Sequence, residues 1–390
     1  MRAAALRIAY MRLLDAAPLI AAQEMGFAEA EGLTLELIAA SSWSSVRDML
    51  TFGRADAAHL LAPMPIAMAL GLGGVQADLS ALSVLSVNGN VIGVSRALET
   101  RLREIGHAFD FVDAARAAVA LAAVAPEVLT IGVPFPFSTH VELLNHWRDA
   151  TPLSATRLEI RTVPPPLMAQ ALASGEIDAF CVGEPWGSVS VEAGVGALLL
   201  PGKAIWSFAP EKVLTVRRDW ASAEPQLRTQ LMRAVWKAGR WLSHPESRTA
   251  AAELLARKEY LDVPAEVIDR ALSGHLMISN SGEPRHVDGF IEFHHGAANF
   301  PWRSQAKWFG ARLAARAGLD VAAASKTASA VFRTDLYRAA LRDLGAELPG
   351  ASEKVEGAIR HPTAVTSQTG RLILNPDAFF DGDIFDPSAL

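Results

Sequence analysis

Short apolar runs alternate with helical patterns through the first half of the chain. The runs are LRIAYM, LTLELIAA, DAAHLLA, ALSVLSV, NVIGVS, LTIGVP, LEIRTV, IDAFCVG, GALLL and EKVLTV. Apolar runs of this length, rich in β-branched residues and bounded by Gly, Pro or polar residues, predict strands. Strands separated by helices predict parallel sheets and an α/β fold.

The last third of the chain has a different pattern. Residues 224–344 carry apolar positions at helical spacing, as in QLRTQLMRAVWKAGRWLS, and are predicted to be mostly helical. From Pro349 onward the chain is rich in Gly, Pro and Asp, which predicts a tail that wraps the surface.

Two segments resemble each other, GRADAAHLLAP from Gly53 and GEIDAFCVGEP from Gly175. Each follows a helical pattern, and each leads from glycine through Asp-Ala and an apolar run to proline. Glycine suits the position just after a helix, where φ is positive. The similarity indicates two lobes of similar topology with one copy in each.

Two predicted helix starts directly follow strand-like runs. Ser45 with Asp48, and Thr139 with Glu142, have the spacing of capping boxes. Ligands of open parallel sheets gather at the carboxyl ends of strands, and helix N-termini favour anions. These starts therefore predict a place for a small anion.

Five candidate residues lie near predicted strand ends or helix starts, namely Trp43, Asn90, His140, Gly183 and Lys212. Each also has a purely structural interpretation. Tryptophan packs in cores, Asn-Gly pairs form turns, and histidine and lysine commonly lie at the surface. Singly, none of them specifies a site.

Composition and missing motifs exclude several classes of function. The 390 residues predict two domains, and the net charge of -6 argues against non-specific nucleic-acid binding. The single cysteine, Cys181, rules out a disulfide framework and is predicted to be a buried thiol. The sequence has no nucleophile elbow, Walker A loop or Rossmann fingerprint, so we expect no enzyme and no cofactor.

We also expect no metal site. His294 and His295 are adjacent and cannot share one helix face, and DAFFDGDIFDP lacks the spacing of a calcium loop. The latter is predicted to be part of the surface tail. At the other end, Arg7, Arg12 and Asp15 interrupt a segment that superficially resembles a signal peptide, which predicts a cytoplasmic location.

Several longer stretches together resemble one known family. They are LDAAPLIAAQEMGFA, SWSSVRD, HLLAPMP, NGNVIGV, STHVELLNHW, PPPLMAQALASGEIDAFCVGEPW and PEKVLTV. The chain is identified through them, from about Leu6 to Phe385, as a member of the nitrate/bicarbonate-binding family of ABC-transporter solute receptors. Within the family it most resembles the NasS-type cytoplasmic nitrate/nitrite sensors.

The resemblance implies a two-lobed, periplasmic-binding-protein-like clamp of type II. Lobe I is expected to be discontinuous, with residues 1–92 as its first part and 214–390 as its second part, which includes the helical C-terminal region and tail. Lobe II is expected over residues 93–213, with NVIGVS and VLTVRR as the crossing strands.

The resemblance also implies nitrate ligands at Trp43, Asn90, His140, Gly183 and Lys212. Asn90 stands where the family has glutamine, so the amide is kept with a shorter reach. Because nitrate only accepts hydrogen bonds, we expect a pocket of donors alone, with Lys212 as counter-charge. Bicarbonate carries a hydroxyl and would favour a carboxylate at the lysine position, so Lys212 argues against it.

The leading functional hypothesis is a cytoplasmic nitrate/nitrite sensor. It would sequester an RNA-binding antiterminator response regulator of the NasT type and release it on ligand binding, without contacting nucleic acid or membrane itself. The alternative is a nitrate or related oxyanion receptor of an ABC transporter. An enzyme on the same clamp fold is a third hypothesis, for which His140 is the one candidate base.

Overall fold

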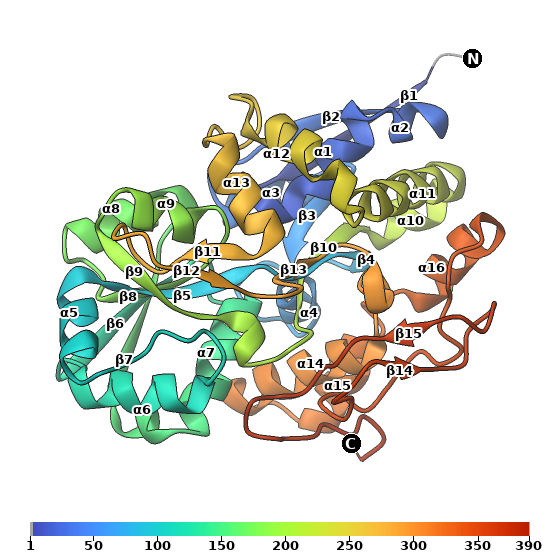
Figure 1. Cartoon of the computed structure of the whole chain (residues 1–390). Helices are drawn as coiled ribbons and strands as arrows, with labels where there is room; N and C mark the ends of the chain where they lie inside the picture. The colour runs from blue at the N-terminus through green and yellow to red at the C-terminus, as the bar shows by residue number, and fades with distance from the viewer. Residues whose placement is uncertain (1–2, 390) are drawn as a thin grey trace.

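Two mixed sheets organise the computed structural model, which describes residues 3–389 (Figure 1). The first sheet has the order β13-β4-β10-β3-β1-β2. Its strands are β1 Ala4–Tyr10, β2 Leu33–Ala39, β3 Ala57–Leu61, β4 Leu79–Asn88, β10 Pro210–Arg217 and β13 Ile291–Glu292. β1 is parallel to β2 and β3, whereas β10 is antiparallel to β3 and β4.

The second sheet has the order β7-β6-β8-β5-β9. Its strands are β5 Asn90–Ser95, β6 Val128–Val133, β7 Arg157–Thr162, β8 Ala179–Gly183 and β9 Gly196–Pro201. β6 is parallel to β7 and β8, and β5 is antiparallel to β8 and β9. All ten predicted strands exist, but the expectation of purely parallel sheets is wrong.

The antiparallel strands are those that border the passages between the sheets. β4 continues through Gly89, at φ +88°, directly into β5 of the other sheet. The chain returns between β9 and β10. NVIGVS therefore lies wholly in the second sheet and VLTVRR begins within the first. The expected lobe boundaries, after residues 92 and 213, remain predictions that lie close to these two passages.

Helices cover both sheets (Figure 1). The helices between the strands of the first sheet are η1 Leu14–Ala16, α1 Ala17–Glu24, α2 Phe27–Ala30, α3 Trp43–Thr51 and α4 Pro63–Ala69. Those around the second sheet are α5 Arg96–Glu104, α6 Ala114–Val124, α7 Thr139–Asp149, η2 Pro152–Ala155, η3 Pro165–Leu167, α8 Met168–Ala173, α9 Trp186–Glu192 and η4 Gly202–Ala204. The segment that resembles a signal peptide is thus β1, η1 and α1.

The last third is mostly helical, as predicted. Its helices are α10 Arg218–Ala223, α11 Pro225–Leu242, η5 Pro245–Ser247, α12 Arg248–Ala256, α13 Ala265–Ser273, η6 His295–Ala297, α14 Arg303–Ala317, α15 Val321–Ser329, α16 Thr334–Leu341 and η7 Arg342–Leu344. Two small hairpins pair β11 His275–Met277 with β12 Pro284–His286, and β14 Thr363–Ala364 with β15 Ile373–Leu374. None of the helices in residues 3–389 is long and apolar enough to span a membrane.

This C-terminal region contacts both sheets' helices. Arg316 of α14 pairs with the buried carboxylate of Glu142 on α7, and His146 of α7 lies 3.3 Å from Asp381 in the tail. Asp377 differs from the expectation that this segment is a surface tail. It is buried, pairs with Lys354, and accepts a hydrogen bond from the backbone of Ile359 at 2.8 Å.

The two similar segments occupy equivalent places, as predicted. Gly53 and Gly175 both have φ +71°, and they precede β3 in the first sheet and β8 in the second. The helix starts differ slightly from the prediction. Ser42, not Ser45, caps α3 by accepting from the backbone N–H of Ser45, and Ser138, not Thr139, caps α7.

Candidate functional site

Lys212 lies on β10 with its ammonium between two carboxylates. Its Nζ is 2.7 Å from Oδ2 of Asp15 and 2.9 Å from Oε1 of Glu211. Lys212 and Glu211 are 0% exposed and Asp15 is 2% exposed. A fully buried lysine requires such partners, because an unpaired ammonium loses its hydration without compensation. Lys212 is therefore a buried ion, not the solvated edge charge typical of lysines at strand ends.

Asp15 extends this cluster toward β3 and α3. Its Oδ1 lies 2.9 Å from Nε2 of His59, whose Nδ1 accepts from the backbone N–H of Met11 at 3.5 Å. Trp43, the first residue of α3, packs against the same group. Its ring centroid is 5.4 Å from that of His59 and 5.5 Å from Nζ of Lys212. The ring face therefore adds a cation–π contact to the ammonium.

Glu211 extends the cluster toward the second sheet. Its Oε2 accepts a hydrogen bond from Nδ2 of Asn90 at 2.8 Å, and its Oε1 lies 3.1 Å from Nδ1 of His140. His140 is the second residue of α7, whose start is tied to β10 by a 2.8 Å hydrogen bond from the hydroxyl of Thr139 to the carbonyl of Pro210. Two helix N-termini, of α3 and α7, thus converge on the cluster.

Gly183, at the end of β8, is close to the same carboxylates. A Cβ atom at this position would lie 3.4 Å from Oδ2 of Asp15 and 3.1 Å from Leu13. That spacing is tight, so glycine permits the backbone of β8 to approach Asp15. The structure therefore brings all five predicted residues into one cluster, and their roles as nitrate ligands remain predictions.

The cluster also corrects one expectation, because it is not made of donors alone. Asp15 and Glu211 are acceptors at its centre, and with His59 they are the residues that the sequence analysis missed. Their signal was present, since LDAAPLI, PEKVL and HLLAPMP contain them. The argument from Lys212 against bicarbonate consequently loses its basis, because a carboxylate does accompany the lysine.

Burial and ion pairing set the charges of these groups. Burial alone would raise the pKa of Asp15, but Lys212 and His59 outweigh it and lower that pKa to about 2. Burial lowers the pKa of Lys212, and Asp15 and Glu211 more than offset this, so the pKa is raised. The ammonium and the Asp15 carboxylate are therefore both charged.

The remaining groups respond mainly to burial. Burial, and then the nearby Lys212, holds the pKa of His140 well below its usual value, and burial lowers the pKa of His59 despite Asp15. Both rings are therefore neutral at pH 7. Burial raises the pKa of Glu211, with Lys212 acting in the opposite direction. Of the two carboxyls at the centre of the cluster, Glu211 is therefore the one whose pKa is raised and not lowered.

Several buried polar atoms of the cluster have no hydrogen-bond partner within residues 3–389. Apart from Oδ1 of Asp15 and Nε2 of His59, which lie 2.9 Å from each other, they are Nε1 of Trp43, Oδ1 of Asn90 and both ring nitrogens of His140. Although Nδ1 of His140 lies near Glu211, the two are not aligned as a hydrogen bond. Native proteins rarely leave such atoms unpaired, so these groups indicate where a ligand would bind.

Contacts between the lobes close over the cluster. The backbone N–H of Leu14 donates to the carbonyl of Glu184 at 2.8 Å, and the indole N–H of Trp186 donates to the carbonyl of Arg12 at 2.7 Å. These bonds join the segment before α1 to the segment between β8 and α9. The clamp is thus closed, which explains why the cluster is shielded from solvent.

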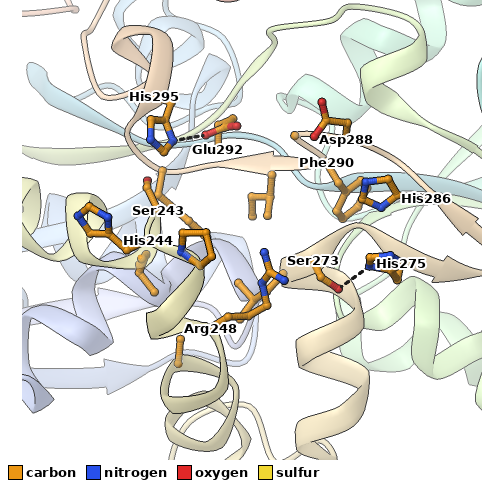
Figure 2. Close-up of a pocket in the computed structure, with 17 residues that line it drawn as sticks. Ser243, His244, Arg248, Ser273, His275, His286, Asp288, Phe290, Glu292 and His295 are labelled. Carbon is orange, nitrogen blue, oxygen red and sulfur yellow. Dashed lines mark hydrogen bonds and ion pairs between the residues drawn. The ribbon is translucent and has the colours of Figure 1, made fainter.

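A separate open hollow of about 320 Å³ lies in the C-terminal region (Figure 2). Arg248 points into it from the start of α12, with His244 on one side and Ser273 and His275 on the other. It contains none of the predicted site residues. In the described part of the chain no three His, Cys, Asp or Glu residues are arranged to hold a metal ion.

The chain is similar in sequence to one protein family and to several characterised proteins. The model of the NMT1-like family matches residues 2–256. The chain is 30% identical over 344 residues to the nitrate import ATP-binding protein NrtC of Synechocystis sp., which covers 87% of this chain. It spans about half of that relative's length, 50%. It is 27% identical over 392 residues to the nitrate/nitrite binding protein NrtA of Nostoc sp., covering 98% of this chain and 82% of that protein.

A solved structure resembles nearly the whole chain. The periplasmic nitrate-binding protein NrtA from Synechocystis PCC 6803 matches with a TM-score of 0.83 and 27% identity, covering 99% of this chain and 96% of that one. This confirms the expected α/β clamp fold. Because the family match spans more than half of its residues, the chain belongs to the NMT1-like family.

Proposed function

We propose that the chain is a solute receptor of an ABC transporter that binds nitrate or a similar monovalent oxyanion between its lobes. The observation that carries the proposal is the convergence of Trp43, Asn90, His140, Gly183 and Lys212 on one buried cluster between the two sheets. A binding role requires no nucleophile or base, so the chain is proposed not to be an enzyme.

The chemistry of the cluster supports an anionic ligand. The indole N–H of Trp43 and the ring of His140 have no hydrogen-bond partner among the described residues, and each belongs to the first turn of a helix. Helix N-termini carry partial positive charge and stabilise anions. A planar anion of one charge suits this combination, because one ammonium already serves Asp15 and Glu211.

Relatives favour the transport role over the sensor role. The similar proteins named for nitrate are import and binding proteins, NrtC and NrtA. The sensor hypothesis, with a NasS-type cytoplasmic location and an RNA-binding antiterminator as partner, is kept as the competing proposal. The sensor hypothesis has the same ligand and the same clamp as the transport hypothesis, and the two differ in the partner protein that the clamp contacts.

Bicarbonate is a second candidate ligand because of Glu211. Its carboxylate lies within 2.9 Å of Lys212 and can accept a hydrogen bond from the hydroxyl of bicarbonate. Nitrate offers no such donor. The two anions therefore use Glu211 differently.

Calorimetric titration of the purified chain tests the ligand. We expect nitrate and nitrite to bind and sulfate not to bind, because one shared lysine would not offset the desolvation of a doubly charged anion. Tight sulfate binding, or no binding of nitrate, nitrite or bicarbonate, would contradict the proposal.

Co-purification separates the two roles. A transport receptor should associate with its permease when liganded, whereas a sensor should hold the antiterminator only without ligand, because closure removes the open form. Stable capture of the antiterminator that nitrate reverses would replace the transport proposal with the sensor proposal.

A further inference from the structure

Glu211 engages three of the five groups that the proposed ligand needs. Its Oε1 lies 2.9 Å from Nζ of Lys212 and 3.1 Å from Nδ1 of His140, and its Oε2 accepts from Nδ2 of Asn90 at 2.8 Å. The side chain is 0% exposed. In the closed clamp this carboxylate therefore accepts from Lys212 and Asn90, donors that an anion would have to share or take over, and it lies beside the ring of His140.

The charges of the cluster oppose binding of a further anion while Glu211 is ionised. Among residues 3–389, Lys212 is the one ammonium in contact with these two carboxylates, and it already lies 2.7 Å from Asp15. With ionised Glu211 the cluster holds one positive and two negative charges. A bound anion would add a third negative charge in a space from which water is excluded, and nitrate, which has no proton, would also set its oxygens against the ionised carboxylate without a hydrogen bond between them.

We propose that Glu211 sets which anion the site accepts, by taking up a proton from solvent when nitrate binds and remaining ionised when bicarbonate binds. The inference rests on the proposed anion-binding function. Nitrate accepts hydrogen bonds only, so the protonated carboxyl donates to it. Bicarbonate has a hydroxyl that donates a hydrogen bond to the ionised carboxylate, so no proton has to be taken up from solvent.

The neighbours of Glu211 leave it as the group that changes charge. Asp15 is held ionised by Lys212, and His59 and His140 are neutral rings. Cys181 of β8 keeps its proton, because burial and then Glu211 raise the pKa of its thiol. Burial likewise raises the pKa of Glu211 itself.

Asn90 can accommodate the added proton. Its Oδ1 is buried and has no hydrogen-bond partner within the described residues, while its Nδ2 donates to Glu211. A protonated Glu211 can still accept this bond through one oxygen, which leaves the O–H on its other oxygen free to donate to nitrate. The same pair therefore has a defined arrangement for either state of the carboxyl.

The decisive measurement compares proton uptake for the two anions. The full chain is titrated with nitrate and with bicarbonate at about pH 8, in buffers that differ in ionisation enthalpy. We expect nitrate to take up about one proton more than bicarbonate. We also expect nitrate affinity to weaken as pH rises, by up to about tenfold per pH unit over the range in which the proton is taken up, because one proton is linked to binding.

Equal proton numbers for the two anions would overturn the inference, as would nitrate binding without any bicarbonate binding. In both cases the proposed anion-binding function stands. If neither anion binds, the proposed function fails instead, so the two failures are distinguishable.

Variants assign the proton to a residue. Glu211→Gln is isosteric and permanently neutral, so it should bind nitrate without proton uptake and lose at least about tenfold in bicarbonate affinity, a loss of one charge-assisted hydrogen bond. Glu184→Gln is the control, because Glu184 is also buried and burial raises its pKa to about 7. It should keep the linkage. If proton uptake on nitrate binding is lost in Glu184→Gln but kept in Glu211→Gln, the assignment of the proton to Glu211 is wrong. If Glu211→Gln does not fold, the comparison of the two anions on the unmodified chain decides.

Discussion

Lys212 and Asp15 form a buried ion pair that joins the beginning of the chain to β10. The ammonium lies 2.7 Å from the carboxylate, although the two residues are 197 positions apart in the sequence. Asp15 belongs to η1, and both Leu14 of that helix and Arg12 just before it contact the second lobe. The pair therefore links the proposed ligand site to the segment that closes the clamp.

Replacing Lys212 with methionine should destabilise the protein as well as weaken anion binding. Methionine keeps the buried stem but leaves Asp15 and Glu211 without their ammonium. Breaking a buried ion pair in this way typically costs about 3–5 kcal/mol of the free energy of unfolding. Nitrate affinity should fall about tenfold to hundredfold, a loss of about 1.5–3 kcal/mol. Denaturant unfolding and calorimetry measure the two effects.

Arg148→Met is the matched control for that variant. Arg148 pairs with Asp149 at 2.7 Å, but the side chains are 37% and 49% exposed. Exposed ion pairs contribute at most about 1 kcal/mol to the free energy of unfolding. The Arg148–Asp149 pair is also not part of the buried cluster. If Lys212→Met costs no more than Arg148→Met, the ion pair does not stabilise the fold as described.

Most strands and the two-lobed organisation could be predicted from the sequence, because apolar runs and the glycines after helices are local signals. The direction of β10 and β5 could not be predicted in the same way. It depends on pairing between segments far apart, such as Lys212 with Leu61 and Asn90 with Gly183. The helix caps were missed narrowly, because SSWSS and FST offer neighbouring hydroxyl residues with similar local chemistry.

The predicted site was incomplete for a different reason. Charged residues in a sequence are normally assigned to the surface, so Asp15, Glu211 and Asp377 gave no sign of burial. Each is buried in contact with a lysine, Lys212 or Lys354, and for Asp15 and Asp377 that lysine comes from another part of the chain. The family motifs include Asp15 and Glu211, but a motif does not reveal which of its residues meet.

Replacing Glu184 with glutamine should stabilise the protein at high pH. Burial raises the pKa of Glu184 from 4.5 to about 7. Since the folded state holds the proton more tightly, this contribution to stability is present below about pH 4.5 and is lost as pH rises to about 7. Glutamine removes the loss, so it should stabilise by about 3 kcal/mol near pH 8 and little near pH 4.

Unfolding curves at both pH values test this prediction. Glutamine can still accept the backbone hydrogen bond that Ser188 donates to Glu184 at 3.1 Å, so packing should be retained. Glu176→Gln, at an exposed position, is the control. A stability difference that is the same at both pH values would contradict the burial of an acid at position 184.

Replacing Trp43 with phenylalanine separates the indole N–H from the ring. The ring that faces Lys212 at 5.5 Å is largely preserved, and the N–H has no partner among the described residues. If that N–H donates to nitrate, affinity should fall about twofold to tenfold, the range for one hydrogen bond of about 0.5–1.5 kcal/mol. Calorimetric titration gives the change.

Trp206→Phe provides the comparison for that variant. Trp206 is also buried, and its indole nitrogen has no partner in the part of the chain that the structure describes, but its ring stacks on Phe379 of the tail with centroids 4.8 Å apart. Its replacement should leave nitrate affinity unchanged. Equal losses in the two variants would show that the Trp43 effect is a general consequence of altered packing.

Replacing Gly202 with alanine should disturb Asn90 without straining the backbone. Gly202 follows β9, and its φ is outside the positive range. An added Cβ would lie 1.8 Å from Oδ1 of Asn90 and 3.0 Å from Leu143, so the amide must move and give up its 2.8 Å bond to Glu211. We expect the free energy of unfolding to fall by about 1–3 kcal/mol, as for other overpacked cores.

Nitrate affinity should fall with it, by about tenfold, if Asn90 contributes one hydrogen bond to the ligand. Gly175→Ala is the control, because Gly175 has φ +71° and open space around its Cβ position. That variant should lose stability through backbone strain while keeping nitrate affinity. In the double variant Gly202→Ala with Asn90→Ala, the two affinity losses should not add, since they act through one amide. Additive losses, or a Gly202→Ala protein that binds nitrate as tightly as the unmodified chain, would remove Asn90 from the site.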